Sequence, residues 1–416
     1  MSPEYDRNPY PILSVLREHA PAYEMPGVGA LFLSRHEDVT TVLSDEDRFS
    51  GDRTLWENYE VPPPDQADHP IIRMQSRNLL TAEGAEHTRL RKLASAALTR
   101  RAVKNLDPLM HALADELIDH FIEAGECDFT KQFAELFPVN IVSRLMGIPK
   151  DSDRERRFKD LADSVVVAFN PMCSEEEKLR SFHSMTLHME EVRVLMEEKR
   201  AHPGNDLMTA MVQAEDDAER HFEPDEILGT LMAILVAGSE TTANSLSFGL
   251  IEFLRHPDQL ARFRDDPSCR ANATAEIVRY QHPGRFLLRY AKCDTTVAGA
   301  SVRKGQMLFL SVPSANRDPA IIDQPDRFDI LRTPYDMSAF GVGRHFCIGA
   351  QLARLELEVG LTHVLERLTD LELIGAFEDI AYRSNPAVRG PASLSIRFKP
   401  GARISASAAH TNEDSP

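Results

Sequence analysis

The chain has 416 residues, of which 42% are hydrophobic and 27% charged, so it can bury a sizeable core and is not a disordered chain, a collagen or a disulfide-stapled miniprotein. Its 65 acidic and 47 basic residues give a net charge of -18, which argues against a nucleic-acid-binding surface. The five cysteines form no C-x-x-C pair, which excludes zinc ribbons and thioredoxin-like pairs and favours a reducing compartment.

The sequence contains no pattern typical of targeting or membrane insertion. The N-terminal residues lack the basic and then apolar segments of a secretory signal peptide. The most apolar stretch, Leu231 to Gly238, is too short to cross a bilayer. We therefore expect a cytoplasmic monomer with no membrane attachment and no nucleic-acid partner.

Short elements are predicted at the N-terminal end, and helices over most of the chain that follows. A helical pattern covers Ile12 to Ala20, and strand-like pieces follow at Ala22 to Met25 and Ala30 to Leu33. From Arg35 to Ile374 most of the chain reads as helices, with clear amphipathic spacing between Leu90 and Leu98.

Two regions interrupt this helical pattern. Residues 51–80 have no period and carry three consecutive prolines, so we expect a long irregular loop there. Residues 151–200 favour two charged helices that are broken at Asn170 and Pro171.

The longest predicted helix begins at Pro224. Proline at the first helical position, followed by Asp225 and Glu226, makes a favourable start, and no breaker follows until His256 and Pro257. We expect a helix of roughly 30 residues, about 45 Å long. Because so long and apolar a helix must be buried, it should run through the middle of the protein.

The pattern changes again after Cys293. Short strands are predicted at Thr295 to Ala298, Met307 to Leu310 and Ser393 to Phe398. Residues 401–416 are small and polar, and we expect a disordered tail. The whole pattern predicts a mainly α fold with a smaller β region, in a single domain over residues 1–400.

A glycine-rich segment surrounds one cysteine. The sequence FGVGRHFCIGA starts at Phe340 and runs directly into a helical pattern, so Cys347 is placed at a helix N-terminus. The helix dipole and free N–H groups there favour a thiolate, and a thiolate is a suitable axial ligand for haem iron. The alternative interpretation is an inert buried cysteine in a turn.

The long helix contains the sequence AGSETT, which starts at Ala237. The Thr241 hydroxyl can donate a hydrogen bond to the Ala237 carbonyl and weaken the helix there. Gly238 leaves room for a ligand against the backbone, and Glu240 is a costly acid in an apolar helix unless it has a partner or a role. The alternative is a satisfied polar residue at a helix kink.

Two further pairs of charged residues are spaced to share a helix face. Glu276 and Arg279 are three residues apart, so their charges can pair, although a surface ion pair would look the same. His87 and Arg91 are four residues apart and can point the same way, as can residues of a solvated basic face.

These segments resemble the cytochrome P450 family, whose haem-binding pattern F-G-x-G-x-H-x-C-x-G-x-x-L-A-R matches at every fixed position. The resemblance covers residues 1–400. It implies a cytochrome P450 fold with a long central distal helix and a cysteine loop and helix on the proximal side of the haem. It also implies haem b (iron protoporphyrin IX), bound by residues that include an axial Cys347 thiolate and propionate ligands: His87, Arg91, Arg289, Phe340, His345, Cys347 and Gly349.

The same resemblance assigns roles to the other motifs. The AGSETT segment matches the family's oxygen-binding helix, which makes Thr241 and Glu240 the catalytic residues that assist oxygen activation and relay protons. The E-x-x-R pattern and the PDRF segment at Pro325 match a buried structural triad, which implies Glu276, Arg279 and Arg327. By family position, the substrate pocket draws on Ile234, Ala237, Gly238, Phe286, Leu287 and Val388.

The function that the resemblance implies is that of a haem-thiolate monooxygenase. It would insert one oxygen atom of dioxygen into an organic substrate, by hydroxylation or epoxidation, and we expect a natural-product intermediate such as a polyketide or macrolide. The chain has no flavin or NAD fingerprint, so a ferredoxin and a ferredoxin reductase must supply the electrons. Eight basic residues between Arg73 and Lys104 would form the docking surface. Arg285 could bind a substrate carboxylate or a carrier-bound acyl group, or lie at the surface.

Two alternatives from other classes stay open at this point. One is a haem-thiolate protein that binds or recruits without turnover, which would not need Glu240 and Thr241 in the distal helix. The other is an all-helical interaction scaffold, which would purify without colour.

Overall fold

A computed structural model describes residues 3–61, 79–148, 150, 174–213, 224–332, 338–383, 385 and 387–404. Its α-helices are α1 (Pro3–Arg7), α2 (Tyr10–His19), α3 (His36–Ser44), α6 (Gly84–Ala97), α7 (Arg100–Asn105), α8 (Asp107–Asp119), α9 (Leu136–Leu145), α11 (Glu175–Ala201), α12 (Leu207–Val212), α13 (Pro224–Arg255), α14 (Pro257–Asp265), α15 (Arg270–Tyr280), α16 (Val312–Ala315) and α17 (Ala350–Arg367). Its strands are β1 (Ala22–Met25), β2 (Ala30–Leu33), β3 (Phe49–Ser50), β4 (Glu126–Asp128), β5 (Leu287–Ala291), β6 (Thr295–Val297), β7 (Ala300–Val302), β8 (Met307–Leu310), β9 (Thr369–Leu373) and β10 (Ser395–Lys399).

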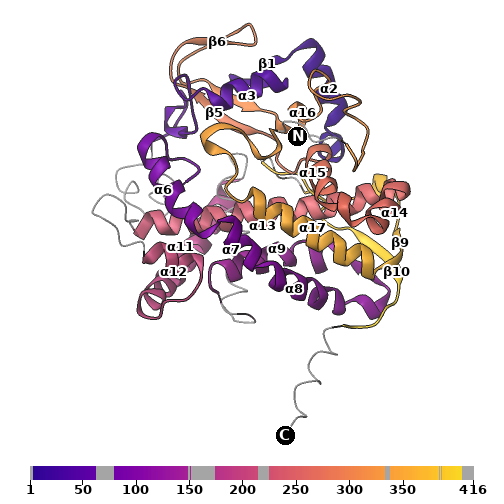
Figure 1. The fold of residues 1–416 in the computed structure, drawn as a ribbon. Helices are drawn as coiled ribbons and strands as arrows, with labels where there is room; N and C mark the ends of the chain where they lie inside the picture. Colours follow the sequence, from indigo (N-terminus) through magenta and orange to yellow (C-terminus); the bar gives the residue numbers. More distant parts are fainter. Residues whose placement is uncertain are drawn as a thin grey trace.

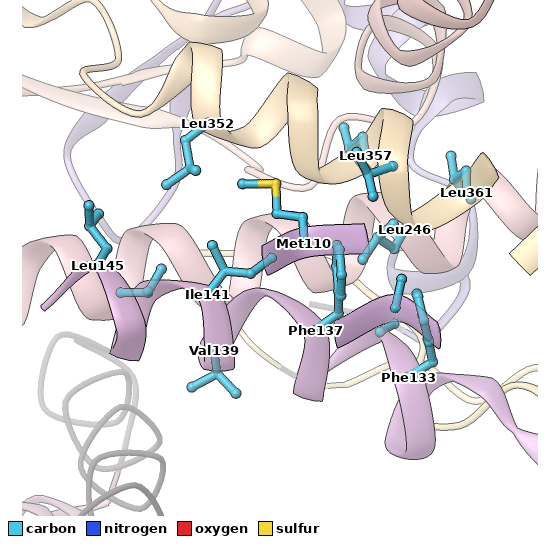
Figure 2. Packing of buried hydrophobic residues seen from close by; sticks show 14 of the residues in the cluster. Met110, Phe133, Phe137, Val139, Ile141, Leu145, Leu246, Leu352, Leu357 and Leu361 are labelled. Carbon is cyan, nitrogen blue, oxygen red and sulfur yellow. The ribbon is translucent and has the colours of Figure 1, made fainter. Parts of the chain in front are cut away.

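The helical part of the fold is built around α13. This helix has 32 residues, is about 48 Å long and contacts α9, α12, α14, α15 and α17. Figure 2 shows apolar side chains of α9, α13 and α17 packing together, among which Phe137, Leu246 and Leu357 are at most 1% exposed. A Cβ added at Gly360 would lie 3.0 Å from the Leu246 side chain, so this glycine lets α17 lie close to α13.

Five strands form the main sheet, beside the helices, and the other described strands form a three-stranded and a two-stranded sheet. The main sheet has the order β1-β2-β8-β5-β3, in which β2 and β8 are parallel and the other neighbours antiparallel. Figure 1 shows β1 and β5 with α2, α3 and α16 in the upper part of the molecule, above the long helices. Successive side chains of a strand point to opposite faces, so Tyr290 is buried in the sheet's core while Arg289 faces the other way.

The predicted fold class, mainly α with a smaller β region, is confirmed. The strands β1, β2 and β8 have the predicted bounds, and α13 begins at Pro224 and ends at Arg255, directly before the predicted breaker. The first of the two helices expected in residues 151–200, most of the irregular loop and most of the C-terminal tail lie outside the described residues. The single domain over residues 1–400 stays a prediction.

The last described residue is tied to the helical part of the fold. The Ile404 N–H donates to the Asp119 carboxylate of α8 (3.0 Å), so the chain is hydrogen-bonded up to that residue. No helix in the described ranges combines the length and the apolar character needed to span a membrane.

Candidate active site

The cysteine loop is held in a tight turn by its own backbone. The Cys347 N–H donates to the Phe340 carbonyl (2.8 Å), and the helix α17 begins three residues after the cysteine. Gly341 and Gly343 have φ angles of 74° and 73°, in the left-handed region that other residues adopt at a cost. A Cβ at Gly343 would also lie 3.1 Å from the Leu43 carbonyl oxygen of α3. Position 343 therefore requires glycine for two reasons, the positive φ angle and the lack of room for a Cβ atom.

The surroundings of the Cys347 thiol have opposing effects on its pKa. The side chain is exposed by surface area, yet the surrounding atoms desolvate the sulfur, and this raises the pKa of the thiol. The Gly349 N–H, Arg91 and Arg354 lower the pKa without fully offsetting the desolvation. The helix start and the two guanidinium groups thus favour the thiolate, and a bound cation at the sulfur would complete the compensation.

Two histidines from distant parts of the chain meet beside this loop. The rings of His87, on α6, and His345 lie 4.2 Å apart between centroids. His87 is fully buried, and neither of its ring nitrogens has a hydrogen-bond partner among the described residues. Burial, Arg289 and His87 lower the pKa of His345 to about 4, so the imidazole is neutral at pH 7. Buried ring nitrogens without partners are costly, which points to an acceptor supplied by a ligand.

The arginines of the predicted site lie around this histidine pair. Arg91 Nη2 donates to the Phe346 carbonyl of the cysteine loop (2.6 Å). Burial lowers the pKa of Arg289, which lines a cavity of about 200 Å³ together with His345 and Glu83. The structure thus brings His87, Arg91, Arg289 and His345 to one place, next to Cys347.

Arg344 and Glu83 were not predicted as site residues. Arg344 donates from Nη1 to the Gly84 carbonyl and to Thr88 Oγ1, both at 2.9 Å, and so fixes the cysteine loop on α6. The Glu83 carboxylate accepts from the Gly51 N–H (2.8 Å) and holds the turn after β3 against the same cavity. Neither residue stands out in the sequence, because each acts through contacts with residues far away in the chain.

The residues present fit a haem group. A thiolate is a ligand for haem iron, and the two carboxylates of a haem need cationic or N–H donors. The orphaned His87 nitrogens and the half-buried Arg289 guanidinium are such donors, and they lie on the same side of the fold as the thiol. Among the described residues, no group of three or more His, Cys, Asp or Glu side chains could hold a metal ion by itself.

The predicted distal residues lie on the middle turns of α13. The Thr241 hydroxyl donates to the Ala237 carbonyl (2.5 Å), as the sequence predicts. Glu240 accepts from Asn385 Nδ2 (3.3 Å), a contact that links α13 to the segment before β10. Ser239 and Ser245 make the same bond to the carbonyl four residues earlier, so several consecutive turns of this helix have carbonyls shared with hydroxyl groups.

Gly238 faces a neighbouring helix on the side where a side chain would lie. A Cβ on Gly238 would lie 3.1 Å from Val142 Cγ2 of α9. The glycine therefore allows the two helices to pack closely, and the room that it leaves for a ligand against its backbone stays a prediction.

The predicted structural triad is correct in two members and wrong in the third. Arg279 and Glu276 are buried and paired through Nε at 2.6 Å. The Arg327 side chain is instead 60% exposed and lies 3.6 Å from Asp329. Arg332 takes its place, with Nε 3.3 Å from Glu276 Oε1. Arg327 contributes only its backbone carbonyl, because the turn at 325–329 directs its side chain to solvent.

The comparisons with known proteins decide the family. The sequence pattern of the family described as "Cytochrome P450" matches residues 23–266 and 271–373. The chain belongs to the cytochrome P450 family. As such it is a haem monooxygenase with a cysteine thiolate ligand, which needs a small-molecule substrate, dioxygen and redox partners.

Two relatives and one solved structure match this P450 over almost its full length. The "Polyketide biosynthesis cytochrome P450 PksS" of Bacillus subtilis (strain 168) is 31% identical, over 94% of this chain and 96% of that one. The "Epothilone C/D epoxidase" of Sorangium cellulosum is 32% identical, over 96% and 94%. The crystal structure of epothilone D-bound cytochrome P450epoK superposes with a TM-score of 0.87 at 28% identity, over 96% and 98%.

The grouping of the predicted substrate residues of this P450 stays a prediction. Phe286 packs edge-on against Phe309 (4.6 Å between centroids), Leu287 is 37% exposed, and Val388 forms a bridge with Gly284. Ile234 is partly buried against the helical core. None of these residues is among those that line the cavity at Arg289.

Two basic side chains of the P450 have other partners than expected. Arg285 is buried and pairs with Asp6 of α1 (2.6 Å), so it does not lie at the surface. Arg89 donates to Glu226 of α13, which neutralises it. Of the eight basic residues between Arg73 and Lys104, the first two lie outside the described residues, and Lys92, Arg100, Arg101 and Lys104 are exposed.

Proposed function

We propose that this P450 oxidises a polyketide or macrolide intermediate, by hydroxylation or epoxidation, with electrons from a ferredoxin and its reductase. The observation that carries the substrate class is the full-length similarity to two relatives whose names state polyketide biosynthesis and epothilone C/D epoxidation. We place the reaction in the cytoplasm, because the sparse, unpaired cysteines suit a reducing compartment.

Cys347 is assigned as the axial ligand of the haem iron. The left-handed glycines before it and the start of α17 after it fix the direction of the sulfur, and Arg91 and Arg354 favour its charged form. His87, Arg91, Arg289 and His345 are assigned to the propionates. When bound, the haem supplies the reduction of dioxygen and the transfer of one oxygen atom to the substrate.

Thr241 and Glu240 are assigned to proton delivery. The Thr241 hydroxyl uses its hydrogen for the Ala237 carbonyl, so its oxygen keeps lone pairs that can hold a water or a proton donor. Glu240 is half-buried and can pass a proton between solvent and the turn of α13 that carries Thr241. Its contact with Asn385 sets the orientation of the carboxylate.

The electron donor is assigned to the exposed basic residues of α6 and α7. Lys92, Arg100, Arg101 and Lys104 form a positive surface in a chain of net charge -18. An acidic ferredoxin would be attracted to that surface, with an association rate that falls as salt is added.

A spectral titration tests the substrate class directly. Binding of a substrate that displaces water from the ferric iron shifts the Soret band, so binding is seen without turnover. We expect saturable shifts with macrolide or polyketide intermediates and none with size-matched steroids. Binding of steroids alone would refute the proposed class.

Reconstituted turnover tests the proton-delivery residues. With NADPH, a surrogate ferredoxin and a reductase, Thr241→Ala should reduce the product formed per NADPH consumed. Ser245→Ala is the matched control, because Ser245 makes the same bond to a carbonyl four residues earlier on the same helix. Equal coupling in wild type and Thr241→Ala would refute the role.

A further inference from the structure

Two histidines face each other across the packing of α8 on α17, away from the cysteine loop. His111 Nδ1 lies 2.6 Å from His363 Nε2, and the ring centroids are 4.9 Å apart. His111 is 47% exposed in its side chain and His363 16%. The pair is therefore reachable from solvent while it joins two helices.

The outer nitrogen of each ring lies beside a carboxylate. His363 Nδ1 is 2.9 Å from Asp115 Oδ1, and His111 Nε2 is 3.5 Å from Asp107 Oδ1. An ionised carboxylate only accepts hydrogen bonds, so it favours the tautomer with hydrogen on the outer nitrogen. In a neutral imidazole the inner nitrogen then carries a lone pair. The 2.6 Å contact between the inner nitrogens is a hydrogen bond, in which the exposed His111 donates to His363 while no ion is bound. When His111 takes the tautomer with hydrogen on Nε2, beside Asp107, both inner nitrogens present lone pairs that a cation between them would bind.

The surrounding charge also favours a cation. Three aspartates share one face of α8 with His111, because the four residues are spaced four apart: Asp107, His111, Asp115 and Asp119. Arg367 pairs with Asp115 (3.1 Å) and Asp119. Glu358 of α17 is electrostatically coupled to Asp107. Arg270 also acts on Glu358, so two arginines face four carboxylates and negative charge stays in excess around the pair.

We propose that His111 and His363 bind one divalent transition-metal ion of the Zn²⁺, Cu²⁺ or Ni²⁺ class. Imidazole nitrogen is a preferred ligand for these ions, and carboxylates on the outer nitrogens are the usual second layer of such sites. Water completes the coordination on the exposed side of His111. The site supplies two protein ligands, which agrees with the finding that no group of three such side chains in the described ranges could hold a metal.

The ligand geometry requires a small movement. Two nitrogens about 2.0 Å from a tetrahedral zinc ion lie about 3.3 Å apart, so the rings must separate by less than one ångström. The exposed His111 side chain can make this adjustment. A bound ion would then fasten α8 to α17, the helix that begins three residues after Cys347.

Calorimetric titration of the haem-loaded protein with Zn²⁺ tests the proposal. Wild type should bind about one equivalent more than the His111→Ala, His363→Ala double variant. At a Zn²⁺ concentration 100 times the dissociation constant, the thermal midpoint of wild type should also rise by about 3 °C, and that of the double variant should not. His120→Ala is the control, since His120 directly follows the same helix and its Nδ1 lies 2.8 Å from the Glu116 carbonyl oxygen.

A third variant separates ligation from a general effect on folding. Asp115→Asn keeps both histidines and should weaken Zn²⁺ binding about 10–100-fold through loss of the outer carboxylate. If the double variant does not fold, His111→Ala alone must lose the extra equivalent, because that side chain is half-exposed. Equal Zn²⁺ binding by wild type and a folded histidine variant would overturn the proposal.

Discussion

The third member of the buried charge cluster gives the sharpest test of the fold that supports the cysteine loop. Glu276 is 3% exposed and accepts from Arg279 Nη2 (2.7 Å), the Asp329 N–H (2.9 Å) and Arg332 Nε (3.3 Å). Arg332 also donates to the carbonyls of Asp323 (2.7 Å), Gln324 (3.0 Å) and Arg327 (2.8 Å). It therefore joins the glutamate to the turn at 323–329.

The expected cost of Arg332→Met follows from these contacts. In this variant Glu276 still pairs with Arg279, so the cost is smaller than that of leaving a buried charge without any partner. The loss of one hydrogen bond to the buried carboxylate and of three partly exposed ones to backbone carbonyls amounts to about 2–4 kcal/mol. Arg327→Met removes only one exposed contact and should cost about 0–1 kcal/mol.

Urea unfolding of the haem-loaded protein measures both variants. Far-ultraviolet circular dichroism gives the free energy of unfolding, and the Soret band shows whether haem is retained. Arg327→Met is the matched control, as it lies on the same turn and is also an arginine. The reasoning is refuted if Arg327→Met destabilises the protein as much as Arg332→Met does.

Two further outcomes are expected. Burial raises the pKa of Glu356 well above 4.5; Thr242 opposes this only in part, and Glu356 Oε1 makes no hydrogen bond of ordinary geometry. The folded state therefore loses stability as pH rises above 4.5. Glu356→Gln should have a higher urea midpoint than wild type at pH 8 and should lose that advantage towards pH 4.5. A difference between the two proteins that does not change with pH would contradict this. A Cβ on Gly390 would lie 1.8 Å from the buried Asn244 Oδ1, so Gly390→Ala should cost about 1–3 kcal/mol. A Cβ on Gly51 would lie no closer than 3.6 Å to another residue, so Gly51→Ala should change stability by less than about 0.5 kcal/mol. Equal effects of the two substitutions would contradict the close contact of Gly390 with Asn244.

The sequence was most informative where local rules decide the structure. Proline and two acids begin α13, a histidine and a proline end it, and the Thr241 hydroxyl reaches the carbonyl four residues earlier because helix geometry places it there. The glycine spacing around Cys347 likewise predicts a tight turn before a helix, and the structure contains one.

The sequence was least informative where a side chain's direction depends on a distant partner. Arg327 and Arg332 are both arginines on one short turn, and only the position of α15 determines which of them reaches Glu276. Arg285 is buried because Asp6, near the start of the chain, lies against it. Gly238 and Val142 meet because α9 crosses α13 at that point. Residue spacing alone contains none of these long-range contacts.

The central claim is that the Cys347 thiolate binds the haem iron. The reduced protein treated with carbon monoxide reports this directly, because a thiolate opposite the carbon monoxide gives a characteristically red-shifted Soret band. We predict this band in wild type and in Cys293→Ser, whose cysteine is also exposed, and its loss in Cys347→Ser. A red-shifted band that survives in Cys347→Ser would contradict the account.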